Sequence, residues 1–235
     1  MFRTTAYSPL GVPLIHSTGP PEAVPTTFAT VLCANLHGYD ELAAALQPTQ
    51  VVSLLEEYFA LLTDAILEFG GQILHLADAD LMAGFGLGDC RHSQILESMA
   101  AARAIQRRFD ATRRSWQERW TVDTSVGIGI HRGEFAIAMF GSEPQGTLVI
   151  IGDTANLASA LCKRARAGEI LMSSAVHGPH AQASGRQAGA GDDLLSLTQV
   201  KLPGRSSALD LWCVPVRERL RMGLDLPQLV RPRDP

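Results

Sequence analysis

The chain has 235 residues, of which 46% are hydrophobic, and its formal net charge at pH 7 is −4. This composition excludes disorder of the whole chain and suffices for one large domain or two small ones. The mild charge gives no reason to expect nucleic acid as a partner. No apolar run reaches the roughly 18–20 residues of a membrane span, and the N-terminus lacks a signal-peptide core. A cytoplasmic location is therefore expected.

Composition divides the chain into three segments. Residues 1–25 contain several prolines and glycines without periodicity, so they are expected to form an arm or linker. A domain is expected over residues 26–216, followed by a surface tail over 217–235. The four cysteines are far apart and show no CxxC spacing, which favours free buried thiols in a reducing compartment. These cysteines are Cys33, Cys90, Cys162 and Cys213.

The first half of the domain alternates strand and helix patterns. The β-branched run TTFATVLCANL, which begins at Thr26, predicts a buried strand. Two helices are expected next, the second beginning at Pro48 and ending before Gly70–Gly71. GQILHLA and LMAGFG predict two short strands joined around Asp78–Ala79–Asp80. A long helix follows over about 91–118, and its arginines are expected to form a solvated face.

The second half favours hairpins. TSVGIGIHRGEFAIAMFG predicts a hairpin that turns at Arg132–Gly133. LVIIGDTANLASALCKRA predicts a strand leading into a helix, with Asp153 or Thr154 as the cap. A short strand, EILMSS, is followed by an expected loop over residues 178–193 and a last hairpin in VKLPGRSSALDLWCVPV. This order indicates an α+β fold with helices packed on a mainly antiparallel sheet.

Six blocks together resemble the class III adenylate/guanylate cyclase catalytic domain. They are TTFATVLCANLHGYDELA, LMAGFG, SVGIGIHRGE, IGDTANLASAL, GEILMSS and VKLPGRSSALDLWCV. The similarity extends over about residues 26–216. It implies a ferredoxin-like cyclase-homology fold and a head-to-tail dimer with nucleotide sites at the subunit interface.

The resemblance also implies where the catalytic metals would bind. The family forms a 3′,5′-cyclic nucleotide with two metal ions, which are held by two aspartates. Asn35 and Ala79 occupy those two positions, and Asp78 and Asp80 flank the second. Because side chains alternate along a strand, both aspartates are expected to point away from where Ala79 points. They are expected to be turn residues bonded to local backbone N–H groups, although a bulge or altered turn could bring one back.

The other site positions of the resemblance are largely changed. His75 replaces the base-recognising lysine, and Val149 stands at the second base-reading position. Asn156 keeps the ribose-orienting asparagine, whereas Ala160 replaces the arginine that stabilises charge on the phosphate. An arginine in such a role is worth roughly 10³-fold or more in phosphoryl transfer. No catalytic residue is therefore expected at these positions, and His75, Val149 and Asn156 are interpreted as a vestigial nucleotide site.

Two functional hypotheses remain open. The first is a non-catalytic cyclase-homology module, a pseudo-cyclase that acts in signalling by dimerisation, partner binding or ligand sensing, with no cofactor. The alternative is an active enzyme that makes a cyclic nucleotide from ATP or GTP with unusual metal ligands, or within a heterodimer, and uses Mg²⁺ or Mn²⁺. Asn35, Asp78 and Asp80 are its weak metal candidates. A relocated transition-metal site that includes His37 and His75 is a further, weaker hypothesis.

The expected partner is a second copy of the chain, another cyclase-homology domain or another signalling protein. Phe135, Ile137, Met139 and Phe140 lie in the predicted hairpin, on surfaces that the family uses for pairing. Each such side chain that stays exposed to water loses roughly 1.5–3 kcal/mol of the free energy that its burial would contribute. The alternative is that these side chains pack inside one subunit.

Overall fold

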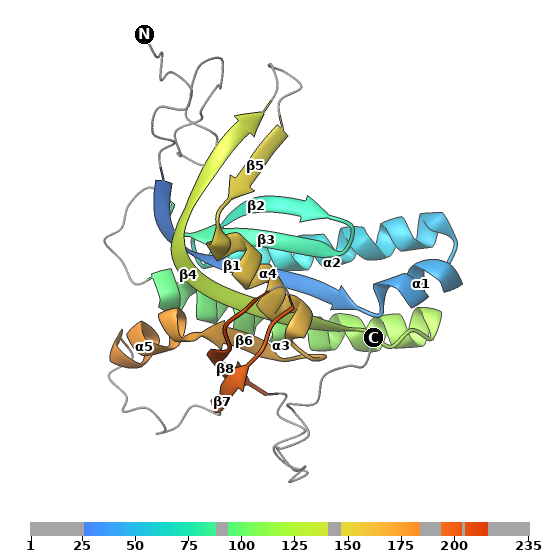
Figure 1. Ribbon diagram of the computed structural model, residues 1–235. Coiled ribbons are helices and arrows are strands. Elements are labelled where there is room, and N and C mark those ends of the chain that lie inside the picture. Colours follow the sequence, from blue (N-terminus) through green and yellow to red (C-terminus); the bar gives the residue numbers. More distant parts are fainter. Residues whose placement is uncertain (1–25, 88–93, 141–146, 184–193, 204, 216–235) are drawn as a thin grey trace.

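The computed structural model describes residues 26–87, 94–140, 147–183, 194–203 and 205–215 (Figure 1). The expected arm and tail, as well as Cys90, lie outside these residues. The strands are β1 (Thr26–His37), β2 (Gln72–Ala77), β3 (Asp80–Phe85), β4 (Ser125–Phe140), β5 (Thr147–Ile151), β6 (Ile170–Ser173), β7 (Leu195–Val200) and β8 (Leu209–Val214). The helices are α1 (Tyr39–Ala45), α2 (Pro48–Glu68), α3 (Gln94–Trp120), α4 (Asp153–Arg164) and α5 (Ser174–Ala183).

The strands form one mixed sheet in the order β2-β3-β1-β4-β6-β8-β7, and β5 pairs with β4. Among the described pairs, β4–β6 is parallel and the others are antiparallel. The first four strands and their helices follow the βαββαβ order of a ferredoxin-like core. The predicted α+β class with a mainly antiparallel sheet is therefore confirmed.

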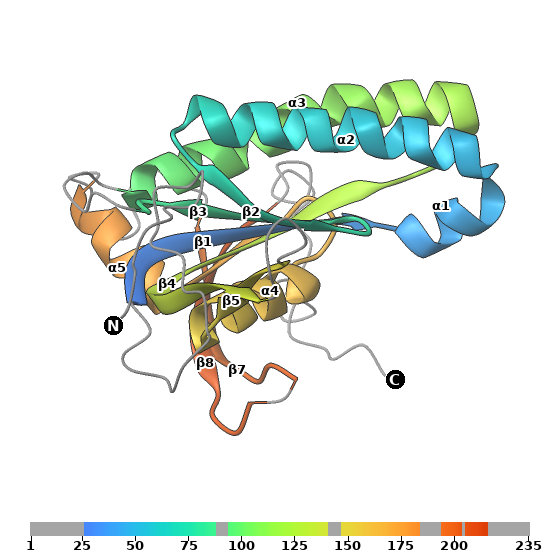
Figure 2. The same cartoon turned by 90° about the horizontal axis from the view of Figure 1, so that it is seen from above.

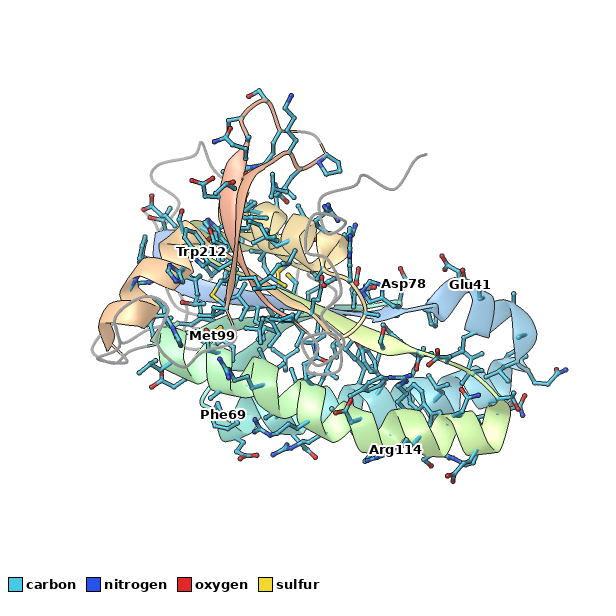
Figure 3. The ribbon with its side chains drawn as sticks, turned by 90° about the horizontal axis from the view of Figure 1, so that it is seen from below. Glu41, Phe69, Asp78, Met99, Arg114 and Trp212 are labelled. Atoms are coloured by element: carbon cyan, nitrogen blue, oxygen red, sulfur yellow. The ribbon has the colours of Figure 1, made fainter. Side chains whose placement is uncertain are left out.

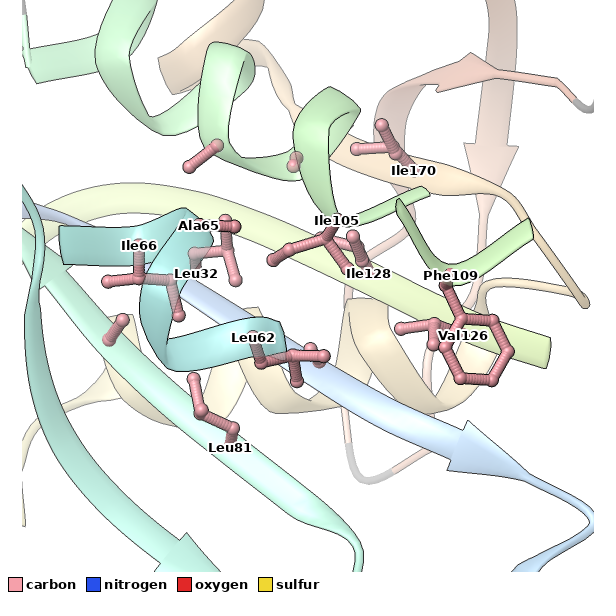
Figure 4. Packing of buried hydrophobic residues seen from close by; sticks show 14 of the residues in the cluster. Leu32, Leu62, Ala65, Ile66, Leu81, Ile105, Phe109, Val126, Ile128 and Ile170 are labelled. Carbon is pink, nitrogen blue, oxygen red and sulfur yellow. The ribbon is translucent and has the colours of Figure 1, made fainter. Parts of the chain in front are cut away.

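Helices α2 and α3 cover one face of the sheet (Figure 2). Every second residue of β1, namely Leu32, Ala34 and Leu36, points into this layer and is buried there. Tyr58 of α2 and Phe109 of α3 meet edge-to-face above the sheet, with ring centroids 6.2 Å apart. Figure 4 shows the same apolar layer from close by. The main hydrophobic core therefore lies between this face of the sheet and helices α2 and α3.

The opposite face carries α4, which packs on β4 and β1. The helix comes unusually close because β4 presents glycines to it. A Cβ atom on Gly129 would lie 2.2 Å from the backbone nitrogen of Cys162. The other residues of β1 on this face, Val31 and Cys33, pack with α4 in a second apolar cluster. The glycine-spaced strand therefore fits a close helix–sheet contact.

The predicted hairpin at Arg132–Gly133 is wrong, because residues 125–140 form one continuous strand, β4. Gly133 pairs with Ala29 of β1 in the middle of the ladder. A Cβ atom at Gly133 would lie 2.6 Å from the Thr154 hydroxyl at the start of α4. The glycine thus allows a close approach of the helix and does not mark a turn.

One further expectation changed. The loop expected over 178–193 begins as helix, because α5 extends to Ala183, and residues 184–193 lie outside the described part. The hairpin predicted near the C-terminus is confirmed as β7 and β8. Three described cysteines, Cys33, Cys162 and Cys213, are buried free thiols. Among the described helices, none combines the length and apolar character needed to cross a membrane.

Candidate active site

Asn35 and Asp80 form a polar pair at adjoining ends of β1 and β3. They are direct partners in the strand register, and the Asn35 Nδ2 donates a hydrogen bond of 2.6 Å to Asp80 Oδ1. Both side chains are half-buried. Because side chains alternate along a strand, Asn35 shares the face of Val31 and Cys33, which is the α4 face. The pair therefore lies at one end of the sheet on the α4 side.

The turn between β2 and β3 sets this arrangement. Asp78 is exposed and has a left-handed backbone, with φ at 51°, a conformation that aspartate tolerates in turns. Ala79 is 3% exposed and packs in the core beneath α2 and α3. Its carbonyl accepts a hydrogen bond of 3.2 Å from the Leu36 N–H. The position that the sequence comparison assigned to a metal aspartate is thus directed away from the α4 face.

The expectation that both aspartates are turn residues bonded to local backbone is therefore wrong for Asp80. The alternation argument correctly separated Asp80 from Ala79: Asp80 shares the face of Asn35, whereas Ala79 packs in the core on the other face. A signal was present in the sequence. A two-residue turn at Asp78–Ala79 makes Ala77 and Asp80 partners, and pairing of β1 with β3 then sets Asp80 opposite Asn35.

The N-cap of α4 is not one of the two residues expected from the sequence, Asp153 or Thr154. The N-cap residue is Gly152, and no side chain caps the helix. Asp153 forms an ion pair with Arg205, and the Thr154 hydroxyl donates to the carbonyl oxygen of Glu134 at 2.7 Å. Both predicted caps thus bind other segments, which fastens the start of α4 to β4 and to the chain after β7.

One chain does not bring His75 together with the other predicted nucleotide-binding positions. His75 is exposed on β2 beside Met82 of β3. Val149 is half-buried on β5, and Asn156 is exposed on α4. Strands β3, β1 and β4 lie between β2 and β5 in the sheet. Ala160, half-buried on α4, offers only a methyl group where an arginine was sought.

The hypothesis of a relocated transition-metal site gains no support. His37 lies against β4, since a Cβ atom on Gly127 would be 2.4 Å from His37 Nε2. His37 is on β1 and His75 is on β2, and β3 lies between these two strands in the sheet. In the part of the chain that the structure describes, no three His, Cys, Asp or Glu side chains are grouped to hold a metal ion.

The expected pairing surface on β4 also needs correction. Phe135 is 2% exposed and Ile137 is 1% exposed, and both pack under α4 with Cys162. These two residues are core residues of a single subunit because they point toward the helix. The side chains of Met139 and Phe140 lie outside the described part.

Comparison with known proteins identifies the fold family. Residues 22–188 match the family model of the adenylate and guanylate cyclase catalytic domain. The chain belongs to this family. An adenylate cyclase of Anabaena cylindrica is 34% identical over 143 residues, which are 59% of this chain and 28% of that protein. The chain thus spans less than a third of that relative's length.

Solved structures of cyclase domains have the same fold. The adenylyl cyclase CyaB from P. aeruginosa superposes with a TM-score of 0.70 at 22% identity, over 83% of this chain and 98% of that chain. A non-canonical dimeric guanylyl cyclase domain from the aquatic fungus Blastocladiella emersonii has a TM-score of 0.65 at 14% identity. That match covers 81% of this chain and 97% of that chain.

Asn35 and Asp80 offer two oxygen donors of the types that a hard divalent cation takes. A carboxylate oxygen and a carboxamide oxygen are suitable ligands for Mg²⁺, which usually keeps several waters and binds one or two carboxylates plus substrate phosphates. Asn35 uses its nitrogen for Asp80, so its oxygen is free of that bond. The pair supplies one negative charge where the family supplies two.

The negative charge of Asp80 affects the pKa values of two neighbouring thiols, Cys33 and Cys162. Burial is the main cause that raises the pKa of Cys33 far above its usual range, and the negative charge of Asp80 raises it further. The pKa of Cys162 is also raised, first by burial, then by Cys33 and Asp80. Both thiols therefore stay protonated and unreactive at neutral pH.

Proposed function

We propose that this cyclase domain forms a cyclic nucleotide from a nucleoside triphosphate, with Asp80 as its metal-binding carboxylate and Asn35 as its neutral neighbour. The supporting observation is the 2.6 Å contact between these two side chains on the α4 face. This contact places the Asp80 carboxylate beside Asn35, which stands at the position of the first metal aspartate. Asp80 itself is one residue after Ala79, which stands at the second position. The similarity to a named adenylate cyclase supports the same proposal.

The chain's own residues would bind and orient the substrate. A divalent cation held by Asp80 and the Asn35 oxygen would neutralise the triphosphate and lower the pKa of the attacking ribose hydroxyl. The Asn35–Asp80 hydrogen bond fixes the carboxylate on the α4 face. Asn156, exposed on α4, is available to a ribose across a subunit interface, as the family resemblance implies.

Product formation tests the proposal. The purified chain is incubated with Mn²⁺ and either ATP or GTP, and cyclic nucleotide is measured by mass spectrometry. We expect product from the wild type and at least a hundred-fold loss in Asp80→Asn, since that variant removes the carboxylate. The control is Asp78→Asn, which changes an exposed turn carboxylate two residues away. Absence of product from the wild type, or an unaffected Asp80→Asn, would reject the proposal.

A second candidate is a non-catalytic module that dimerises or binds a ligand in cyclic-nucleotide signalling. The methyl group of Ala160 and the carboxamide of Asn35 favour it, because each replaces a charged group of the family pattern. This candidate predicts that metal–nucleotide binds without turnover. Calorimetry with a non-hydrolysable ATP analogue, run beside the product assay, distinguishes the two candidates.

We also propose that the domain pairs with a second copy or with another cyclase domain. The guanylyl cyclase domain from Blastocladiella emersonii is a non-canonical dimer, which supports pairing of such domains. The division of the nucleotide-site positions between β2 on one side and β5 and α4 on the other also supports it. Symmetric pairing of this kind gives a closed assembly.

A further inference from the structure

Helix α4 has two flanks that differ in character. One flank packs in the apolar cluster beside β7 and β8, and its members are Leu157, Leu161 and Ala165. Ala158 and Cys162 point at the sheet. With successive residues about 100° apart around a helix, the opposite flank carries Asn156, Ser159 and Lys163. This polar flank has an exposed asparagine, a half-buried serine and an exposed lysine.

The polar flank of α4 is turned toward the candidate active site. β6, β8 and β7 lie on one side of β4 in the sheet, whereas β1 and β3 lie on the other. Since the apolar flank faces the β7–β8 side, the polar flank faces β1 and β3. Figure 1 shows α4 lying across β4 and β1.

Lys163 follows the residue that touches the sheet at the level of Asn35. A Cβ atom on Gly127 would lie 3.3 Å from the carbonyl oxygen of Cys162, and Gly127 is the register partner of Asn35. The next residue along the helix is Lys163. Its long side chain therefore starts above the row of the sheet that contains Asn35 and Asp80.

We propose that Lys163 binds a phosphate oxygen of the triphosphate held at Asn35 and Asp80, an inference that rests on the proposed metal–nucleotide site. An ammonium group binds phosphate as a point charge. Lys163 is seven residues after Asn156, on the same helical stripe, and three residues after Ala160. It supplies a positive charge from the same chain that holds Asn35 and Asp80.

Calorimetric titration with Mn²⁺ and inorganic tripolyphosphate tests this role without requiring turnover. Lys163→Met should weaken tripolyphosphate binding about ten-fold, and Lys163→Arg should restore most of it because it keeps the charge. Arg114→Met is the matched control, since Arg114 is an exposed cation on α3, in the helical layer on the other side of the sheet (Figure 3). Thermal unfolding of each variant checks that the fold is intact.

The outcomes separate this inference from the proposed function. Weaker binding in both Asp80→Asn and Lys163→Met, with Arg114→Met unchanged, supports both. Wild-type binding by Lys163→Met together with loss in Asp80→Asn overturns the role of Lys163 alone. If Lys163→Arg binds as poorly as Lys163→Met, the charge is not what matters and the inference fails. No tripolyphosphate binding by the wild type would overturn both.

Discussion

The carboxamide of Asn35 donates a hydrogen bond to the carboxylate of Asp80 across the β1–β3 pair, at 2.6 Å. The neighbouring methyl group of Ala79 points to the other face of the sheet and is buried there. Asp80, one residue further along the chain, therefore places its carboxylate on the α4 face beside Asn35. The Asp80 carboxylate is half-buried here beside one neutral carboxamide, so the pair carries a single negative charge.

Restoring the second carboxylate at position 35 should strengthen metal binding. Asn35→Asp sets two carboxylates side by side, so we expect about ten-fold tighter Mn²⁺ binding by calorimetry. Without metal the two like charges repel, and the melting temperature in a chelator should fall below that of the wild type. Asn35→Ala is the control and should bind Mn²⁺ more weakly than the wild type. Unchanged Mn²⁺ affinity in Asn35→Asp would contradict a metal site at this pair.

An aspartate at position 79 should instead destabilise the fold. The Ala79 side chain is 3% exposed and packs in the core beneath α2 and α3. Ala79→Asp would bury an uncompensated carboxylate, and we expect the free energy of unfolding to fall by about 3 kcal/mol. Urea unfolding measures it. Asp78→Asn, in the exposed adjacent turn position, should stay within about 0.5 kcal/mol of the wild type. A fully stable Ala79→Asp with tighter Mn²⁺ binding would show that the turn can rotate this residue to the α4 face.

The sequence predicts the fold well because its signals are local. The apolar stripe of α2 and the turn at Gly70–Gly71 agree with the helix that the structure shows. Gly133 misled the prediction, since a glycine next to a charged residue is typical of a turn, whereas here it makes room for Thr154. That contact joins residues 21 positions apart, and no local pattern encodes it.

The site was harder to predict than the fold because its geometry depends on register. Sequence matching assigned the metal position to Ala79, but cross-strand pairing decides which residue of the turn shares the face of Asn35. The positions of Phe135 and Ile137 depended likewise on which face of β4 the helix α4 covers. Both outcomes follow from packing between elements far apart in sequence.

Acid should destabilise the domain through His131. Burial lowers the pKa of His131, against a smaller opposing effect of Asp153, and its Nδ1 lies 2.7 Å from the Ser173 hydroxyl. The folded state therefore holds the ring neutral, while the unfolded chain binds a proton below about pH 6.5. The stability is present above that pH and is lost as the pH falls through it.

The test compares melting temperatures at about pH 7.5 and about pH 5. We expect the drop on acidification to be smaller in His131→Gln than in the wild type, because glutamine keeps a polar partner for Ser173 but does not titrate in this range. His75→Gln, at an exposed position on β2, is the control and should retain the wild-type drop. An equal drop in all three proteins would show that His131 does not set the acid sensitivity.

Pairing of two chains should depend on the exposed apolar residues beside β4. Phe28 of β1 is 51% exposed and Ile151 of β5 is 46% exposed. Ala136 of β4 is the register partner of both Thr26 and Ile151, so by alternation Phe28 and Ile151 share one face of the sheet. Large apolar side chains left on the same face favour an interaction surface.

Sedimentation at micromolar concentration measures the pairing. We expect a dimeric mass for the wild type and a shift toward monomer in Phe28→Glu and Ile151→Glu, because each introduces a charge into an apolar contact and the two-fold symmetry introduces it twice. Leu67→Glu is the control, since Leu67 is 57% exposed on α2, away from β4. Phe135→Glu should instead lower the melting temperature, because Phe135 is buried under α4. A monomeric wild type, or a dimer that only Leu67→Glu weakens, would contradict pairing through the β1–β4–β5 face.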